Sequence, residues 1–564
     1  MWPHRGFESD CDTQEYFNVQ QKNIWEFRLS FAWLMGGALV SLLSIFIFLI
    51  LLSIPGFRYY QLNQERDLFL EAAEIRNTAS EINLQPRKKI LDRNGIELAT
   101  DILRPTLLFK NENDKNIAKD ILISESQEIF LNTKRRIYLE TKVSKSTLSN
   151  IQKACSCVPI REDTFKRYYP FGSIFGPVIG FSGTDGGLEG VEKVMNEDLV
   201  IGEIKSTFNQ SGRGEKLYGQ LEDFINLGNN ESLSLTLDTN LQFKLFNELK
   251  DAISNSKAKG GSALIMNSES GEILAMVSYP TFNPNNPDRV IERNKVIDDF
   301  FEPGSLIKPV TVAGALKLGH IKRNSVINTN PGFVTLSGYK RSEAGGKNFG
   351  RINPSETISK SSQVGIAKIA IKFSSDEMRD NLGQFGFGKE LKMQWVNNSA
   401  GKIIDNPKLY DIDKASLGYG YSLTSNSLQI ARAYSVFANE GVMIEPRILS
   451  GIKSERVRVL SKSTASFILD SLRMTVLDGT ASNLKDEGIA IAGKTGTSEK
   501  YIEGVGYASE KYVSSFASIF PYNEPKFIMI VSIDEPDPNK YFGGDVSAPV
   551  VGKLSKFMKR LKYL

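Results

Sequence analysis

Residues 302–309 read Glu-Pro-Gly-Ser-Leu-Ile-Lys-Pro, and this stretch organises the rest of the chain. Pro303 and the glycine after it form a turn signal, and a largely apolar run follows. That run predicts a buried helix that begins at Ser305 and stops at Gly319, because glycine is favoured just past a helix C-terminus. The sequence therefore places Ser305 at a helix N-terminus and Lys308 one turn later on the same face.

This spacing is that of a nucleophile and its base. A serine hydroxyl attacks well only when a base takes its proton, and a lysine in apolar surroundings has a lowered pKa because burial disfavours its charged form. A helix N-terminus also favours negative charge on the reacting oxygen. The pattern Ser-x-x-Lys alone is common by chance, and an ordinary N-cap serine beside a surface lysine is the plainer interpretation. Other features of the sequence must decide between the catalytic and the structural interpretation.

The composition disfavours the main competing chemistries. The two histidines are His4, ahead of the apolar segment described below, and His320, at the far end of the predicted helix. A Ser-His-Asp triad is therefore disfavoured, and no His-Glu-x-x-His zinc motif is present. We expect no cofactor and no metal. The net charge of +4 over 564 residues, without a basic arm, gives no indication of nucleic acid binding.

The N-terminal region predicts a membrane anchor. Residues 1–28 are polar and mixed in charge, as in a disordered tail. Phe31 to Ile54 contains no charged residue, and as a helix it would span about 36 Å, enough to cross a bilayer. A cleaved signal peptide fits less well, because the run is too long and no Ala-x-Ala-like site follows. We expect a single-pass anchor over residues 29–55 with the tail inside, since nearly all the mass follows it.

The element pattern after the anchor predicts an α+β protein. Residues 60–82 favour an amphipathic helix, and the Gly/Asn-rich section 205–230 favours a linker or hairpin. A main domain then begins near residue 231. Its expected helices are 239–254 (capped by Asp238), segments within 357–440, 462–477 and one opened by Ala548-Pro549; its expected strands are 262–266, 272–276, 488–492, 514–520 and 527–533. This order predicts an antiparallel sheet flanked by helices, with the loop-rich section 321–355 bordering a site.

The three cysteines do not form a disulfide framework. Cys155 and Cys157 are near enough in sequence for a local bridge in an oxidising compartment. The favoured interpretation is that Cys155 and Cys157 are unpaired and serve simply as small residues.

Three motifs stand in order along the chain: Ser305-x-x-Lys308, Ser361-Ser362-Gln363 and Lys494-Thr495-Gly496. This ordered set resembles the penicillin-binding proteins, whose signature is S-x-x-K, S-x-N and K-T-G. Flanking segments are similar to the same family: Arg293-Asn294, Gly479-Thr480 and Tyr541–Gly544. Others resemble the non-catalytic pedestal of its class B members: Arg87, Asp92–Gly95, Arg167–Pro170 and Gly187–Glu192. The chain most resembles the septal D,D-transpeptidases, of the penicillin-binding protein 3 type, with the elongation-specific class B enzymes as the near alternative.

The resemblance implies a domain organisation of tail (1–28), anchor (29–55), pedestal (56–230) and transpeptidase domain (231–564). It implies that Ser305 is acylated by the D-Ala-D-Ala end of a peptidoglycan stem peptide, with Lys308 as its base. It implies that Ser361, Gln363 and Lys494 form a hydrogen-bonded group that relays a proton and stabilises the charge of that network. It assigns the substrate carboxylate to Thr495, Gly496 and Thr497, and the oxyanion hole to the backbone N–H groups of Ser305 and Thr497. A second strand's amine would then attack the acyl-enzyme and form the crosslink.

The sequence departs from the family pattern at four places. The most important is Gln363, which stands where the family has asparagine and carries its amide one methylene farther out. A displacement of about 1 Å at such a group costs roughly 100-fold in rate unless the surroundings compensate. The other departures are Lys88, the segment Asn426–Gln429 and Ser518. These departures are compatible with reduced activity.

The favoured hypothesis is a septal transpeptidase in the bacterial inner membrane, with its catalytic domain in the periplasm. Its expected ligands are stem peptides and β-lactams, and its expected partners are a polytopic lipid II glycosyltransferase and other membrane proteins of the division machinery. The alternatives are an elongation-type enzyme and a weakly active scaffold of the division complex, the second motivated by Gln363. A β-lactam sensor would need several membrane spans and a metalloprotease motif, and a β-lactamase would not need the pedestal.

Overall fold

The computed structural model describes residues 43–67, 78–84, 86–109, 111–124, 129–130, 138–141, 145–155, 157, 160–183, 186–201, 203–209, 232–287, 291–393, 395, 398–502, 504 and 506–564. The chain folds as two compact units. The first comprises Met1–Asn83 and Glu203–Asn226, and the second Leu84–Gly202 and Leu227–Leu564. The domain boundaries at residues 28, 55 and 230 stay predictions.

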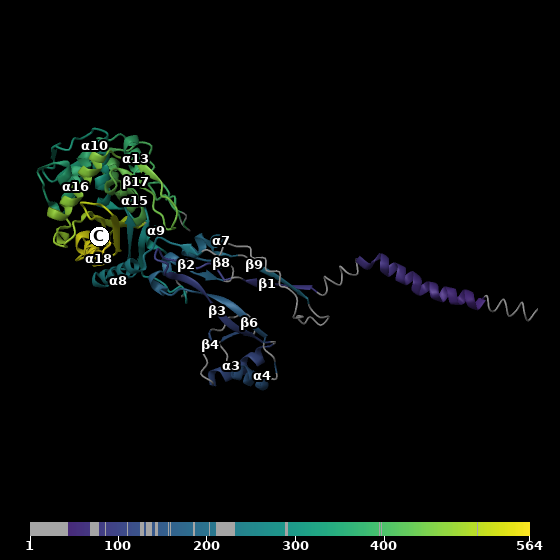
Figure 1. Ribbon diagram of the computed structural model, residues 1–564. Helices are drawn as coiled ribbons and strands as arrows, with labels where there is room; N and C mark the ends of the chain where they lie inside the picture. Colours follow the sequence, from purple (N-terminus) through teal and green to yellow (C-terminus); the bar gives the residue numbers. More distant parts are fainter. Residues whose placement is uncertain are drawn as a thin grey trace, which may run out of the picture. The chain divides into compact units, whose positions relative to one another are not determined.

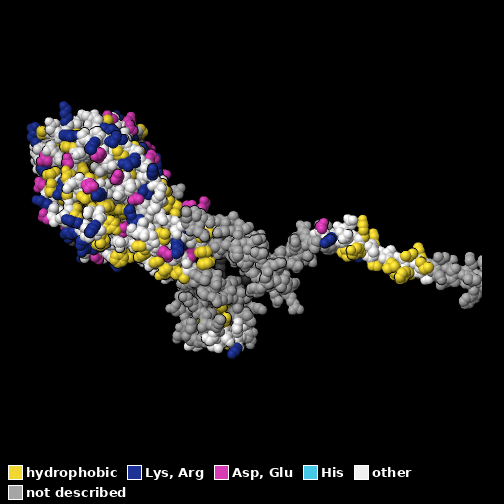
Figure 2. Space-filling view, viewed as in Figure 1, with side chains coloured by type: hydrophobic (Ala, Val, Ile, Leu, Met, Phe, Trp, Pro, Cys, Tyr) yellow, Lys and Arg dark blue, Asp and Glu magenta, His cyan; other side chains and the backbone are white. Residues whose placement is uncertain are grey.

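The first unit contains an apolar helix, Leu43–Gln64, with a mean hydropathy of 1.7 over its most apolar window and none of that window buried. Among the described residues it is the one helix long and apolar enough to span a membrane. Apolar side chains cover it, and charged ones gather toward one end (Figure 2). The predicted tail, and the part of the predicted anchor before residue 43, lie outside the described residues.

The same unit contains a two-stranded sheet of β1 (Thr78–Leu84) and β9 (Glu203–Asn209). The predicted helix over residues 60–82 is therefore wrong at its C-terminal end. The partner strand lies more than a hundred residues later in the chain, and this long-range pairing leaves no trace in the local periodicity.

The pedestal part of the second unit is built on a six-stranded sheet. Its strands are β2 (Ile90–Leu91), β3 (Glu97–Leu108), β4 (Ile129–Phe130), β5 (Tyr138–Thr141), β6 (Ile160–Tyr168) and β10 (Leu233–Ser234), with β6 paired to β3. Helices α3 (Glu112–Ser124) and α4 (Lys145–Cys155) enclose a small core of their own. Short elements follow: α5 (Gly176–Ile179), β7 (Ser182–Gly183), β8 (Gly186–Gly187), α6 (Gly190–Val194) and α7 (Asn196–Leu199).

Cys155, the last residue of α4, forms a disulfide with Cys157, so the prediction of two unpaired cysteines is wrong. Their Cα atoms are 5.1 Å apart, which lies inside the usual range of about 4.4–6.8 Å for a disulfide. The end of the helix brings the two residues to this separation.

A buried ion cluster joins β3, β6 and α6. The Glu192 side chain has no solvent exposure and lies 3.0 Å from Arg87 Nη2 and 2.6 Å from Arg167 Nε. Arg167 Nη1 also lies 3.0 Å from Asp101 Oδ1. These are residues of the pedestal-like motifs, so two arginines far apart in sequence meet on one carboxylate.

Replacing Glu192 with alanine is expected to lower the free energy of unfolding of this region by about 3–5 kcal/mol, because two buried guanidinium groups lose their shared partner. The measurement is urea unfolding of the full chain in detergent. The control is Glu197→Ala, an exposed carboxylate on α7 that is expected to change stability by no more than about 0.5 kcal/mol. Equal effects of the two variants would show that the buried cluster contributes little.

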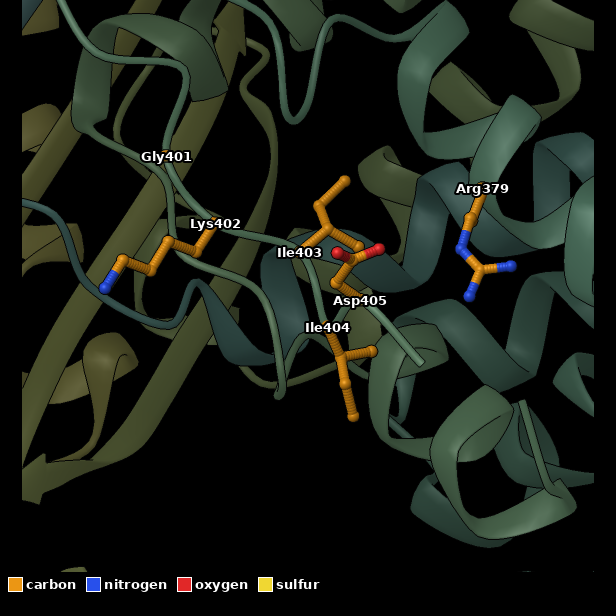
Figure 3. Close-up of a pocket in the computed structure, with 6 residues that line it drawn as sticks. All are labelled: Arg379, Gly401, Lys402, Ile403, Ile404 and Asp405. Carbon is orange, nitrogen blue, oxygen red and sulfur yellow. The ribbon is translucent and has the colours of Figure 1, made fainter. Parts of the chain in front are cut away.

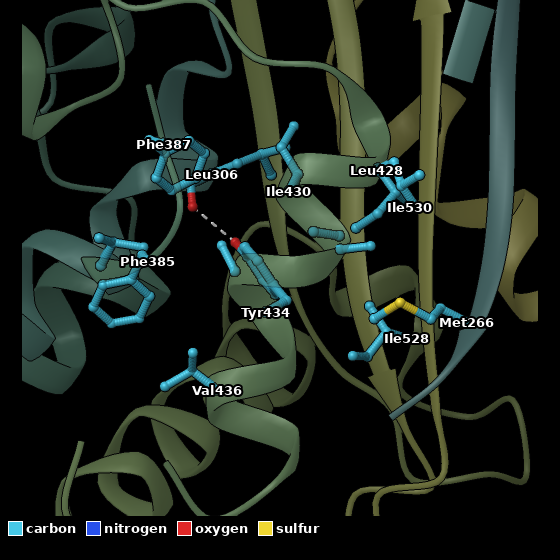
Figure 4. Packing of buried hydrophobic residues seen from close by; sticks show 14 of the residues in the cluster. Met266, Leu306, Phe385, Phe387, Leu428, Ile430, Tyr434, Val436, Ile528 and Ile530 are labelled. Carbon is cyan, nitrogen blue, oxygen red and sulfur yellow. Dashed lines mark hydrogen bonds between the residues drawn. The ribbon is translucent and has the colours of Figure 1, made fainter. Parts of the chain in front are cut away.

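The catalytic part of the second unit is organised around a five-stranded antiparallel sheet, in the spatial order β12 (Ile273–Tyr279), β11 (Gly260–Asn267), β21 (Phe527–Asp534), β20 (Gly506–Phe520) and β19 (Ala492–Ile502). Strand side chains alternate between the two faces. One face packs on α8 (Thr239–Asn255) and α18 (Ala548–Arg560) through a core that includes Ala263, Ile265, Met529, Val531, Leu245 and Leu554. The other packs on α15 (Ser427–Ala438), where Met266, Ile528 and Ile530 lie near Leu428 and Ile430 (Figures 1 and 4). The predicted α+β architecture is confirmed.

Further helices lie on the side of the second face: α9 (Lys295–Asp298), α10 (Lys308–Lys317), α11 (Pro354–Ser359), α12 (Gln363–Ala370), α13 (Ser375–Gln384), α14 (Asp411–Gly418) and α16 (Lys462–Asp478). Helix α17 (Gly543–Val546) packs on α18, and its Val546 belongs to the core of the first face. Small two-stranded sheets border them: β13 (Ile327–Asn328) with β16 (Arg351–Ile352), β14 (Phe333–Leu336) with β15 (Tyr339–Ser342), and β17 (Val442–Ile444) with β18 (Arg456–Arg458). The Asp238 carboxylate accepts hydrogen bonds from the backbone N–H groups of Asn240 and Leu241, so the predicted cap of α8 is confirmed.

One predicted strand boundary is wrong in a way that matters for the site. Residues 488–492 were expected to form a strand that ends before the Lys-Thr-Gly motif, whereas β19 begins at Ala492 and contains the motif. Pairing with β20 is the physical reason, since Lys494 lies opposite Ala517 and Thr495 opposite Phe516. The motif is therefore held on the sheet rather than on a loop.

Candidate active site

The chain makes a tight turn before α10. Residues Gly304–Ile307 form a 3₁₀ turn and the α-helix starts at Lys308, so the predicted helix start at Ser305 is wrong by three residues. Gly304 has φ +53, and its N–H donates to the carbonyl oxygen of Gly420 over 2.9 Å. A Cβ on Gly420 would lie 2.0 Å from the Gly304 oxygen, so this close approach requires glycine. The Tyr434 hydroxyl donates to the Leu306 carbonyl oxygen over 2.9 Å and fixes the turn from below (Figure 4).

Lys308 is completely buried, and its amine reaches the second motif. Lys308 Nζ donates to the Ser361 carbonyl oxygen over 2.6 Å and to Ser361 Oγ over 3.1 Å. Ser361 Oγ in turn lies 3.1 Å from Ser305 Oγ. Burial lowers the pKa of Lys308 to about 7, against a smaller opposing effect of Glu343. The three predicted residues are thus brought together, with Ser361 between the other two.

Ser361 adopts a conformation that few serines adopt, with φ +57. Non-glycine residues in this region are strained, and such strain persists only where the surrounding structure fixes it. Here the two bonds from Lys308 hold the residue in place.

Lys494 occupies the opposite wall, on β19. Its side chain is buried, and Nζ donates to the Thr495 carbonyl oxygen over 3.0 Å. Burial, and secondarily the charge of the nearby Lys308, lower the pKa of Lys494 well below its usual value. The two amines are therefore close enough to disfavour a charge on both at once. The buried positive potential between them suits a carboxylate or a developing oxyanion.

The two threonines of β19 are held from neighbouring segments. Thr495 Oγ1 lies 2.6 Å from Thr480 Oγ1, and Thr497 Oγ1 accepts a hydrogen bond from the Gly543 N–H over 3.2 Å. The flanking segments that the sequence singled out thus support the Lys-Thr-Gly strand directly. Gly496 packs on the nucleophile turn, because a Cβ there would lie 2.9 Å from Leu306 Cγ.

Gln363 begins α12 next to Ser362, whose hydroxyl accepts a hydrogen bond from Gly365 N–H and caps the helix. The Glu343 carboxylate accepts from the Ser362 hydroxyl over 2.5 Å and from the Gln363 backbone N–H over 2.7 Å. By contrast, the side-chain oxygen of Gln363 is buried without a hydrogen-bond partner among the described residues. The backbone of the second motif is firmly held, while its side-chain amide is not.

Sequence reasoning missed Glu343 and Gly420 and assigned no role to Thr480. Glu343 does lie in the section 321–355 that was predicted to border the site, yet nothing in its local pattern distinguishes it from other surface carboxylates. Gly420 carries a weak signal, since it stands in a Tyr-Gly-Tyr segment where a glycine between aromatics indicates a constrained backbone.

A cavity of about 500 Å³ lies elsewhere in the catalytic part, between α13 and the segment 401–405. Arg379 and Asp405 face it from opposite sides, and Ile403 and Ile404 line it (Figure 3). None of the motif residues lines this cavity, so it is distinct from the Ser305 site.

Known proteins are similar to this chain over most of its length. Residues 261–556 match the penicillin binding protein transpeptidase domain. The peptidoglycan D,D-transpeptidase FtsI of Buchnera aphidicola subsp. Schizaphis graminum is 32% identical, over 93% of this chain and 95% of the relative. The enzyme of the same name from Escherichia coli K12 is also 32% identical, over 78% of this chain and 75% of its own.

Solved structures of penicillin-binding proteins superpose on this chain. The transpeptidase domain of Burkholderia pseudomallei penicillin-binding protein 3 is 32% identical and superposes with a TM-score of 0.53, covering 58% of this chain and 96% of that one. Penicillin-binding protein 3 of Mycobacterium tuberculosis is 23% identical with a TM-score of 0.65 over 86% of this chain and 97% of that one, and shares the fold. By its ordered motifs, its fold and these matches, the chain belongs to the penicillin-binding protein transpeptidase family.

Proposed function

We propose that this protein is a peptidoglycan D,D-transpeptidase that crosslinks stem peptides in septal cell-wall synthesis. One observation carries the proposal: the buried amine of Lys308, with a pKa of about 7, is linked through the Ser361 hydroxyl to Ser305 in the turn before α10. This is the arrangement that serine acyl transfer requires. The relatives named as peptidoglycan D,D-transpeptidases FtsI match nearly the whole chain, which supports the septal role.

The proposed reaction begins at Ser305. Its oxygen attacks the carbonyl carbon of the penultimate D-alanine, while its proton passes through the Ser361 hydroxyl to neutral Lys308. Hydroxyl hydrogens rotate freely, so the Ser361 hydroxyl can accept from one neighbour and donate to the other. The carbon–nitrogen bond then breaks, D-alanine leaves with a proton returned by the relay, and an ester remains on Ser305. A second strand's amine attacks this ester, loses its proton to the same relay and releases the serine.

The proposed substrate contacts lie on β19. The terminal carboxylate of the donor peptide binds at Thr495, Gly496 and Thr497, beside the positive potential of Lys494. The oxyanion is held by the backbone N–H groups of Ser305 and Thr497. The position of Gly304, whose Cβ would lie 3.3 Å from the Thr497 carbonyl oxygen, brings these two backbones together and supports this assignment.

We place the protein in the bacterial inner membrane, with the helix Leu43–Gln64 as part of its anchor, the tail cytoplasmic and the catalytic domain periplasmic. The disulfide between Cys155 and Cys157 supports this orientation, because disulfides persist in oxidising compartments such as the periplasm. The proposed partners are a polytopic lipid II glycosyltransferase and other membrane proteins of the division machinery.

The unpartnered side-chain oxygen of Gln363 favours a second candidate, a scaffold of the division complex with little activity. Changing Gln363 to asparagine separates the two. In an active enzyme we expect a single covalent adduct with fluorescent penicillin, and a rate of acylation about tenfold higher in the variant, because the shorter side chain restores the family's geometry.

The measurement is adduct formation over time in the full chain in detergent, followed by gel fluorescence and intact mass. Gln384→Asn, an exposed glutamine on α13, is the matched control and leaves the rate unchanged. Absence of any adduct in both the native protein and the Gln363 variant, with the chain folded, would reject the enzyme in favour of the scaffold.

A further inference from the structure

Glu302 lies three residues before Ser305, and the proposed reaction does not use it. Its Oε1 accepts hydrogen bonds from the Ser422 N–H over 2.8 Å and from the Tyr507 hydroxyl over 3.2 Å. Its other oxygen, Oε2, is buried and has no hydrogen-bond partner among the described residues. A buried carboxylate oxygen without a donor is costly, and this cost raises the pKa of Glu302. The structure therefore leaves one strong acceptor unfilled in the segment that leads into the nucleophile turn.

Tyr507, which donates to this carboxylate, belongs to a cluster of tyrosine rings. The ring centroids of Tyr421 and Tyr507 are 5.6 Å apart, and Tyr501 lies 5.5 Å from Tyr507, both pairs edge to face. Tyr501 and Tyr507 come from the outer ends of β19 and β20, and both are well exposed, at 63% and 47%. Tyr421 belongs to the segment whose Gly420 bonds the nucleophile turn. The rings thus stand between the solvent and Glu302.

Two carboxylates lie on this side of the site. Glu302 and Glu499, which lies near Tyr421, have no ion-pair partner among the described residues. Lys308 and Lys494 lie on the far side of Ser305, where the donor carboxylate is proposed to bind. Proteins bind ammonium groups with a carboxylate and neighbouring aromatic rings, because the cation is attracted both to the negative charge and to the ring faces.

We propose that Glu302, Tyr421 and Tyr507 form the site that receives the amine of the second stem peptide, the acceptor of the crosslinking step. This inference rests on the proposed transpeptidase function and adds to it the group that selects the acceptor. Tyr507 covers Glu302 when the site is empty. An entering ammonium group displaces the Tyr507 hydroxyl and binds the Glu302 carboxylate. It passes one proton to that carboxylate, and the neutral amine is then held next to the ester on Ser305.

The proposed acceptor site acts only in the second half of the reaction, the attack on the acyl-enzyme. Acylation of Ser305 by the donor needs Lys308, Ser361 and β19, none of which contacts Glu302 through a hydrogen bond among the described residues. Attack by the acceptor needs the amine to outcompete water for the same ester. Loss of the Glu302 charge should therefore shift the acyl-enzyme from aminolysis toward hydrolysis without slowing its formation.

The test uses the full chain in detergent with a thioester analogue of the donor terminus and D-alanine as the acceptor amine. Glu302→Gln keeps the size of the side chain and an acceptor for the Ser422 N–H while removing the charge. Chromatography separates the aminolysis product from the hydrolysis product, and fluorescent penicillin reports acylation separately. The matched control is Glu524→Gln, whose carboxylate is 77% exposed on the loop between β20 and β21.

We expect Glu302→Gln to acylate within twofold of the native rate while its aminolysis-to-hydrolysis ratio falls about tenfold, and Glu524→Gln to change neither. An unchanged ratio with normal acylation overturns this inference and leaves the transpeptidase function standing. A parallel loss of acylation and aminolysis also overturns it, because Glu302 would then merely support the Ser305 turn. A native protein that never forms an acyl-enzyme overturns both.

A second variant tests the proposal independently, in case Glu302→Gln does not fold. Tyr507→Phe removes the hydroxyl that competes for Glu302 and keeps the ring. We expect a roughly threefold lower D-alanine concentration for half-maximal aminolysis, at an unchanged acylation rate. No change in this concentration contradicts the proposed displacement of Tyr507.

Discussion

Replacing Ser305 with alanine is expected to abolish covalent labelling by fluorescent penicillin and to lower D-alanine release by on the order of 10⁴-fold or more. The variant removes the oxygen at the end of the Lys308–Ser361–Ser305 chain, and the remaining groups can bind substrate but cannot form the ester. Intact mass of the full chain after incubation measures the loss. Peptide mapping of the native adduct should place the label on residue 305.

The matched control is Ser463→Ala, an exposed serine near the start of α16, which is expected to label like the native protein. The Ser361 hydroxyl is near enough to substitute, since its oxygen lies 3.1 Å from that of Ser305. An adduct that persists in the Ser305 variant and maps to residue 361 would therefore contradict the assignment of the nucleophile.

Replacing Lys308 with methionine is expected to reduce the acylation rate by about 10²–10⁴-fold, the usual contribution of a positioned general base. Methionine matches much of the buried volume of the lysine stem, so the fold is expected to persist, and the loss reports the missing amine. Stopped-flow measurement of penicillin acylation gives the rate. Lys317→Met, at the exposed end of the same helix, is the control.

The native protein should show the corresponding pH dependence. Burial lowers the pKa of Lys308 to about 7, so its amine is neutral and able to accept a proton above that pH and is charged below it. The acylation rate is expected to fall about tenfold per pH unit below about 7 and to level off above about 8. A rate that stays flat from pH 5.5 to 8.5 would show that Lys308 is not the base.

Much of the site could be predicted because its motifs are local. The turn before Ser305, the spacing of Lys308 and the stop at Gly319 follow from residues within a few turns of one another, and the structure confirms the stop with φ +77 at Gly319. The alternating strands and the capped helix α8 likewise depend on neighbours in sequence. The order of these elements was enough to predict an antiparallel sheet flanked by helices.

Predictions failed where pairing with another strand, rather than the local pattern, decides the structure. The strand β1 forms because β9 offers it hydrogen bonds, and β19 extends through the Lys-Thr-Gly motif because β20 lies beside it. Neither pairing leaves a local periodic pattern. The Cys155–Cys157 disulfide was missed for a different reason, since the sequence does not show whether two neighbouring thiols are oxidised.

The sequence by itself determined which groups could do the chemistry: a serine and a lysine one turn apart, a second serine, and a lysine followed by threonine, with histidine absent from the region. Only the tertiary structure decided how they act together. It set Ser361 between Ser305 and Lys308, put Glu343 against the second motif, and left Glu302 with one unfilled oxygen under Tyr507. The physical reason is that pKa, burial and hydrogen bonding are properties of the space around a residue, and that space is filled by segments up to two hundred residues away.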